Sequence, residues 1–137
     1  MCLKVIDKEN EIFTAIRNAV KEKYPEVLLS SSYVRSPASF PYVSVIQIDS
    51  YEPKKYIDSS KKELFATLAF QIDVYSDDES RKKSICKSIM QTIDNTLRQM
   101  NFRRESLSAV PNMADATIYR LTARYTVTAS EDSFYSA

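Results

Sequence analysis

One stretch of this chain, residues 64–100, joins a long strand pattern to a long helix pattern and constrains the fold more than any other segment. Over residues 64–75 apolar side chains occupy every second position, which predicts a strand with one wholly apolar face. Asp77 and Asp78 follow and are suited to cap a helix start. The helix then repeats apolar residues at a spacing of four, so its apolar stripe is expected to cover that strand face. The two sets are Leu64, Ala66, Leu68, Phe70, Ile72 and Val74 in the strand, and Ile85, Ile89, Ile93 and Leu97 in the helix.

The absence of glycine and of histidine excludes several classes of active site. Phosphate-cradling loops and dinucleotide turns need glycine to bring the backbone close to a ligand. Catalytic triads, histidine proton shuttles and most zinc or iron sites need histidine. Cys86 lies on the apolar side of the predicted helix, so a small buried hydrophobic residue is favoured over a nucleophile. We therefore expect no enzyme activity, no cofactor and no metal.

The charges are balanced, with 19 basic and 18 acidic side chains among 137 residues. No global field draws such a chain to nucleic acid or to an anionic membrane. No apolar run approaches the roughly 20 residues of a membrane-spanning helix, and residues 1–6 are too short and too weakly basic for a secretory signal. Cys2 and Cys86 fit a reducing compartment better than a disulfide framework. We expect a soluble protein that is made inside the cell.

The remaining patterns predict one α+β domain. Residues 7–23 form an amphipathic helix pattern, residues 27–31 are compatible with a short strand, and strand patterns cover residues 42–51, 102–110 and 117–129. At Val45 and Ile46 the alternation is interrupted, which indicates a bulge or burial on both faces. The expected architecture is a largely antiparallel sheet of about four strands with two helices packed on one face. Residues 1–130 form the domain, and residues 131–137 are a short polar tail, expected to lack fixed structure in a lone subunit.

A lysine-rich segment, residues 52–63, connects the first two long strand patterns. It is long for a hairpin connection, and long connections are commonly mobile or functional. One interpretation is a loop that faces a partner or DNA, and the other is a solvated loop tip, which is the more common origin of such clusters. The candidate residues are Lys54, Lys55, Tyr56, Lys61 and Lys62.

The second faces of two strands supply candidates for a subunit interface. Arg120 and Arg124 stand among threonines on one face of the last strand pattern. Arginine suits interfaces because its planar fork pairs well with carboxylates, although a merely soluble outer face explains the pattern equally well. Phe65, Ala69 and Tyr75 lie on one face of the strand pattern at residues 64–75, the face that a single layer of helices leaves uncovered. Such apolar surface is what a subunit buries against a neighbour.

Acidic residues offer the remaining chemistry. Asp77 and Asp78 have a sufficient structural role at the helix start, so a metal or general-base role is the minor interpretation. Asp49 and Asp73 lie near the ends of two strands that are expected to pair. If the two carboxylates met, they could hold a hard cation, but the sequence fixes no strand register.

Several stretches resemble one family of structural proteins. They are the N-terminal helix ending at Tyr24 and Pro25, the segments FPYVSVIQI and LAFQIDVYSDDESRKKSICKSIMQTIDNTL, and the closing YRLTARYTV. Together they are similar to the tail terminator, or tail completion, proteins of tailed bacteriophages and phage-derived tail-like particles. The complete lack of glycine departs from what the family leads us to expect and leaves the loop conformations open.

The resemblance implies a protein that caps the head-proximal end of a tail tube, usually as a ring of six subunits. Such a ring ends tail polymerisation and offers a surface for head-tail joining. The implied partners are further copies of this chain, the tail tube protein and the head-tail connector protein, with DNA only as cargo passing through the lumen and no membrane. The implied location is the host cytoplasm during assembly and then the virion or tail-like particle.

Two other functions remain open at this stage. The chain is compatible with a head-tail connector or tail tube component of the same particle. It is also compatible with a small enzyme or nucleic-acid-binding module that uses Asp49, Asp73 or the lysine-rich loop, although the balanced charge disfavours the nucleic-acid version.

Overall fold

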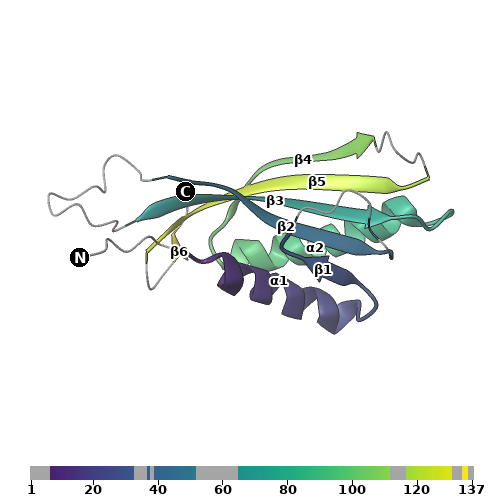
Figure 1. The fold of residues 1–137 in the computed structure, drawn as a ribbon, viewed down its shortest axis with the longest axis horizontal. Coiled ribbons are helices and arrows are strands. Elements are labelled where there is room, and N and C mark those ends of the chain that lie inside the picture. The colour runs from purple at the N-terminus through teal and green to yellow at the C-terminus, as the bar shows by residue number, and fades with distance from the viewer. Residues whose placement is uncertain are drawn as a thin grey trace, which may run out of the picture.

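The computed structural model describes residues 7–32, 37, 39–51, 65–111, 117–130 and 134–135. Within these ranges it has an α+β fold in which two helices lie on one face of a mixed sheet (Figure 1). The sheet order is β1-β2-β3-β5-β4, and β6 pairs with β5. The elements are α1 (Glu9–Lys23), β1 (Leu28–Ser30), β2 (Tyr42–Tyr51), β3 (Ala66–Ser76), α2 (Lys82–Gln99), β4 (Arg103–Pro111), β5 (Tyr119–Ala129) and β6 (Phe134–Tyr135).

The predicted class and the placement of both helices agree with this fold, but the predicted number of about four strands is too low. Besides the four long strands, the sheet contains β1, which pairs in parallel with β2, and the two-residue β6. The other strand pairs are antiparallel. β6 was missed because it lies in a segment expected to lack fixed structure, although Phe134 packs against Phe102 with ring centroids 6.1 Å apart.

The central strand, β3, has the alternation that its sequence predicts. Ala66, Leu68, Phe70, Ile72 and Val74 are all fully buried on the face that meets the helices. β3 pairs along its whole length with β5, from Ala66 opposite Ala129 to Ser76 opposite Tyr119. A strand paired on both sides and covered on one face forms the centre of the hydrophobic core.

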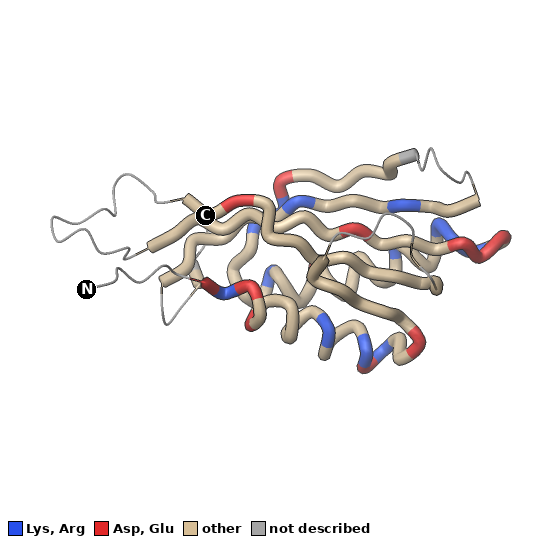
Figure 2. Tube along the Cα trace, in the orientation of Figure 1, with Lys and Arg blue, Asp and Glu red and all other residues tan. Residues whose placement is uncertain are grey.

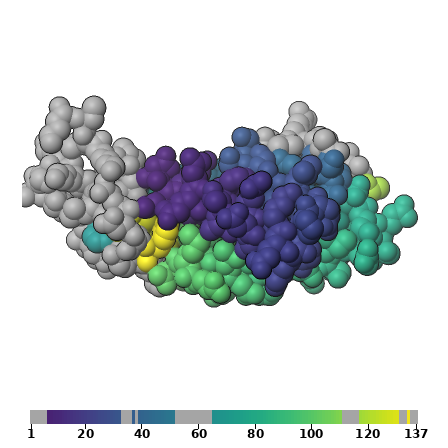
Figure 3. All heavy atoms as spheres, turned by 90° about the horizontal axis from the view of Figure 1, so that it is seen from below, coloured from purple at the N-terminus to yellow at the C-terminus, as the bar shows by residue number. Residues whose placement is uncertain are grey.

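Both helices close the core from the same side and lie next to each other (Figure 3). α1 buries Ile12, Ile16 and Val20, while its outer side carries both basic and acidic residues (Figure 2). α2 buries Cys86 among its apolar residues, and burial raises the pKa of the Cys86 thiol to about 12. Cys86 is therefore a protonated core residue at neutral pH, in agreement with the interpretation that the sequence favoured.

The acidic turn before α2 differs in detail from the prediction. The helix begins at Lys82 and its N-cap is Arg81, so neither aspartate is the cap residue. Instead, Asp78 Oδ1 accepts hydrogen bonds from the backbone N–H groups of Arg81 (2.9 Å) and Ser80 (3.1 Å). These bonds, that to Arg81 first, lower the pKa of Asp78. Asp78 thus fixes the turn that leads into the helix, from a position three residues before the N-cap.

Strand β2 has the predicted bounds, but its irregularity lies elsewhere. The register with β3 shifts between Gln47 and Asp49, two residues beyond the predicted position at Val45 and Ile46. Val45 is fully buried and Ile46 half-buried, so burial on both faces accounts for the interrupted alternation there. The bulge at Ile48 marks the point where β2 leaves the core, because the residues from there to Tyr51 are exposed.

The end of α2 shows how this chain forms a helix stop without glycine. Asn101 has a positive φ of 70°, the left-handed conformation in which glycine is usual. The Phe102 N–H donates to Leu97 O (2.9 Å) and the Asn101 N–H to Arg98 O (3.1 Å), which together make a Schellman motif. Asn101 Nδ2 also donates to Phe134 O (2.8 Å), so the backbone of this residue ends the helix while its side chain holds β6.

We expect Asn101→Ala to lower the free energy of unfolding by about 2 kcal/mol, because alanine is strained at positive φ and cannot bond to Phe134. Asn101→Gly keeps the backbone conformation and loses only the side-chain bond, so we expect its loss to stay below about 1 kcal/mol. Urea unfolding of the two variants measures the difference. Equal stabilities for the alanine and glycine variants would contradict the backbone part of this explanation.

Candidate interaction surfaces

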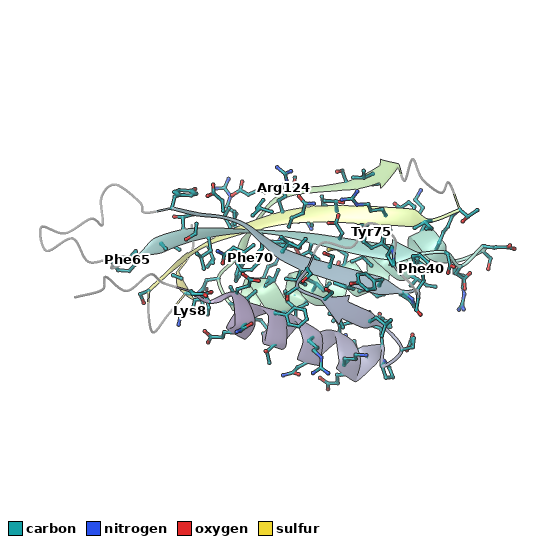
Figure 4. The ribbon with its side chains drawn as sticks, viewed as in Figure 1. Lys8, Phe40, Phe65, Phe70, Tyr75 and Arg124 are labelled. Atoms are coloured by element: carbon teal, nitrogen blue, oxygen red, sulfur yellow. The ribbon has the colours of Figure 1, made fainter. Side chains whose placement is uncertain are left out.

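Among the described elements, both helices lie on one face of the sheet, and the opposite face is the first candidate surface (Figure 1). We call it the outer face. Arg124 lies on this side of β5 and Phe70 lies on the helix side of β3 (Figure 4). The outer face is largely polar, and its residues from β3 and β5 are Thr67, Ala69, Gln71, Asp73, Tyr75, Arg120, Thr122, Arg124, Thr126 and Thr128.

Of the predicted interface residues, Ala69, Tyr75, Arg120 and Arg124 share this outer face, and Phe65 directly precedes β3. Tyr75 is only 4% exposed, because its ring packs edge-on against Tyr42 with centroids 6.2 Å apart. The Arg120 guanidinium also lies 5.7 Å from the Tyr75 ring centroid. The expectation of uncovered apolar surface at Tyr75 is therefore not met, since residues of the same subunit already cover it.

The two arginines of β5 on the outer face, Arg120 and Arg124, have different surroundings. Arg120 Nε donates to Asp73 Oδ1 (3.0 Å), and the Asp73 side chain is 3% exposed. Thr122 donates to the same oxygen, and Gln71 Nε2 donates to Asp73 Oδ2 (3.1 Å). Arg124, opposite Gln71 in the ladder, is exposed and forms no ion pair with any described residue. Arg124 is thus the arginine that is available to a neighbouring molecule.

The proposed pair of Asp49 and Asp73 does not meet. Strands β2 and β3 do pair, but Asp49 lies opposite Ala69 while Asp73 lies opposite Ser44. Across the described ranges, no group of three or more cysteine, aspartate or glutamate residues is placed to hold a metal ion. The candidate loop residues Lys54, Lys55, Tyr56, Lys61 and Lys62 lie outside the described residues.

A second candidate surface, which the sequence pattern did not predict, is a groove between α2 and strand β4. Its volume is about 230 Å³. Residues 103–109 of β4 are all exposed, so this end strand of the sheet lies only partly against the helix below it. The groove is lined by Lys87, Met90, Gln91, Asp94, Arg104, Leu107 and Leu121. A signal in the sequence was Leu107, an apolar residue within the otherwise polar segment 103–108.

One of the residues that line this groove is a buried carboxylate that ties three elements together. Asp94 of α2 accepts hydrogen bonds from the Tyr125 hydroxyl (2.7 Å), Arg98 Nε (2.6 Å) and Arg104 Nη1 (3.4 Å). Burial opposes ionisation of Asp94, but the bonds from Tyr125 and Arg98 outweigh it, and the pKa of Asp94 is lowered. Burial and the bond to this carboxylate raise the pKa of Tyr125. Asp94 is therefore ionised at neutral pH and holds Arg104 beside the groove.

The sequence contained a partial signal for this network. Asp94 is the only acidic residue of α2, it directly follows Ile93 of the apolar stripe, and Arg98 stands four residues later. Such a spacing predicts a helix-surface ion pair. That the carboxylate is buried beneath β5 and also meets Arg104 depends on tertiary packing, which spacing along one helix cannot reveal.

Across the described residues, neither helix combines the length and apolar character needed to cross a membrane.

No protein-family model matches the sequence, and no curated protein matches it. One solved structure similar to this chain is the sheath/tube terminator of an extracellular contractile injection system, PVC, determined by cryo-EM in the extended state. The two chains are 11% identical with a TM-score of 0.49, and the match covers 100% of this chain and 62% of the other. This chain thus spans less than two thirds of the length of that terminator chain.

Proposed function

We propose that this protein is a structural assembly protein that caps the head-proximal end of a phage tail tube, or of the tube of a phage-like particle, as a ring. The ring ends tail polymerisation and offers a surface for head-tail joining. Its partners are further copies of this chain, in a ring of six, together with the tail tube protein and the head-tail connector protein.

The observation that carries the proposal is the arrangement of the segments that resemble tail terminators. These segments lie in β2, β3 and β5, which are adjacent strands, and in the two helices that cover one face of them. The resemblance thus concerns one packed unit rather than scattered pieces. The unit leaves its outer face without a helix, as a subunit needs when a sheet is to pack against a neighbour.

The outer face offers a defined contact to a neighbouring subunit. Arg124 stands exposed near the middle of β5, with Gln71 beside it on β3 and threonines at Thr122 and Thr126 on its own strand. A guanidinium in this setting suits a carboxylate on the next subunit, because each carboxylate oxygen can accept one arm of the planar fork. Arg120 is less suited to that role, since it already pairs with Asp73.

We expect Arg124→Glu to reduce capping of tail tubes by about tenfold, because a desolvated charge pair of this kind contributes at least 1.4 kcal/mol and its reversal adds repulsion. Lys83→Glu is the matched control, since Lys83 is an exposed cation on α2, away from the outer face. Tail lengths by electron microscopy and the mass of the protein with and without tube protein are the measurements. Thermal unfolding of both variants checks that the fold is intact.

The result that would overturn the proposal is a strict monomer that does not bind the tube protein at high concentration. Particles that lack this protein separate it from a neighbouring component: loss of a terminator gives overlong or unjoined tails, whereas loss of a tube component gives no tails. An unchanged capping yield with Arg124→Glu would show that Arg124 does not lie in the interface. The measured mass of the protein would then decide whether a ring forms.

A further inference from the structure

Strand β4 ends the sheet and is the most exposed of its long strands. It pairs with β5 on one side, and in the described part of the chain no strand pairs with its other side. Alternate residues of such an end strand direct both their N–H and C=O groups outward, which makes the edge a template for another strand. Leu107 is 42% exposed on this strand although it faces the helix side, opposite Ala123.

The groove below this edge has room for an apolar side chain. Met90 of α2, Leu107 of β4 and Leu121 of β5 contribute its apolar lining. A cavity of about 150 Å³ lined by aliphatic side chains is large enough for benzene, so a groove of about 230 Å³ can take a leucine side chain or an aromatic ring. An added strand would direct every second side chain toward this groove.

The charges around the groove are basic. Every exposed charged side chain of α2 is a cation, and the acid of this helix, Asp94, is buried and held by Tyr125 and two arginines. Lys87 and Arg104 stand at the groove itself. Glu105 of β4 accepts a hydrogen bond from Thr126 (2.7 Å), which lies on the outer face rather than on the groove side. A segment that enters here therefore meets positive potential along one helix and one strand.

We infer that the β4 edge and this groove bind an extended, acidic segment of a partner protein, which adds to the sheet as a further strand. An apolar side chain of the segment fills the space between Met90, Leu107 and Leu121, and a flanking carboxylate meets Lys87. Arg104, which Asp94 holds, adds to the positive potential at the groove. Backbone pairing supplies affinity, and the pocket and the cations supply selectivity. The inference goes beyond tail capping and does not depend on it, since it rests on an edge, a groove and a charge pattern.

The experiment uses the full-length protein and a fluorescent nine-residue peptide, with binding followed by anisotropy. The peptide has leucine at its centre, glutamate two positions away on either side so that all three side chains share one strand face, and threonine elsewhere. We expect saturable binding that weakens at least tenfold when lysine replaces glutamate in the peptide. We also expect at least a tenfold loss when the peptide is N-methylated at alternate residues, because the methyl groups remove the donors needed for strand pairing. Amide shifts in NMR spectra are expected at β4 and at Lys87.

Two variants locate the site on the protein. Leu107→Glu should weaken binding at least tenfold, whereas Leu28→Glu should not, because Leu28 is a similarly exposed leucine (43%) on β1, at the opposite end of the sheet. Lys87→Glu should also weaken binding of the glutamate peptide and improve binding of the lysine peptide. Since Lys87 is an exposed helix residue, this charge exchange remains informative even if Leu107→Glu perturbs β4.

Three outcomes would overturn the inference. They are no binding at 1 mM peptide, equal binding of the lysine or N-methylated peptides, and self-association of the protein that Leu107→Glu abolishes, since the last would assign the edge to a second copy of this chain. None of these measurements involves a tail component, so a failure here is distinguishable from a failure of the proposed capping function.

Discussion

Replacing Asp94 with alanine is expected to lower the free energy of unfolding by about 3 kcal/mol, because a buried carboxylate with three donors is removed. Tyr125 is fully buried, so its hydroxyl would be left without an acceptor in the core. Arg98 and Arg104 are more exposed and can turn to water, which keeps the loss at the lower end of the range for buried ion pairs. Urea unfolding at pH 7 measures the change.

Two further variants separate the contributions at Asp94. Tyr125→Phe removes the hydroxyl that Asp94 accepts from, and we expect it to lose only about 1 kcal/mol because no unpaired donor is left in the core. Asp94→Asn keeps an acceptor for Tyr125 but removes the charge that Arg98 and Arg104 meet, and should lie between the other two. A loss for Asp94→Ala no larger than that for Tyr125→Phe would show that the network contributes little.

The pH dependence of these variants has a defined sign. The pKa of Asp94 in the folded protein is lower than its ordinary value of 3.8, so the folded state favours the ionised form. Its stabilisation is complete above the unfolded-state pKa and is lost as the pH falls through the folded-state pKa. The stability difference between the wild type and Asp94→Asn should therefore be constant near neutral pH and shrink below about pH 4. A difference that grows on acidification would contradict this assignment.

The parts of the fold that the sequence predicted are those determined by local pattern. β3 and β5 alternate strictly, and α2 repeats its apolar residues every fourth position, so both the elements and their buried faces could be read directly. Phe134 was different, because it lies in a short polar segment and is ordered by contacts with Phe102 and Asn101 from distant parts of the chain. Local pattern contains no information on such contacts.

The candidate surfaces were less predictable than the fold, for a related reason. The pattern placed Arg120 and Arg124 on one face of a strand, but the register with β3 decides their roles. Asp73 lies opposite Thr122 and next to Arg120, which leaves Arg124 two positions further on with Gln71 opposite it. The groove depends on how far α2 extends beneath β4, the end strand of the sheet. This is a property of helix packing that no single segment encodes.

The two buried aspartates give the outer face and the groove a common construction. Asp73 holds Arg120 on the outer face, and Asp94 holds Arg104 at the groove. In each case a nearly buried carboxylate fixes a more exposed arginine, which limits the conformations of a long side chain before any partner arrives. Each surface also has a cation that is not held in this way, Arg124 on the outer face and Lys87 at the groove.

Asp73→Ala is expected to lower the free energy of unfolding by about 3 kcal/mol, since it removes the acceptor of Arg120, Thr122 and Gln71 at a position that is 3% exposed. The double variant Asp73→Ala with Arg120→Ala should be less destabilised than the sum of the two single changes by about 1–2 kcal/mol, because the pair is coupled. Urea unfolding of all four proteins measures this coupling. Additive losses would mean that Asp73 does not hold Arg120.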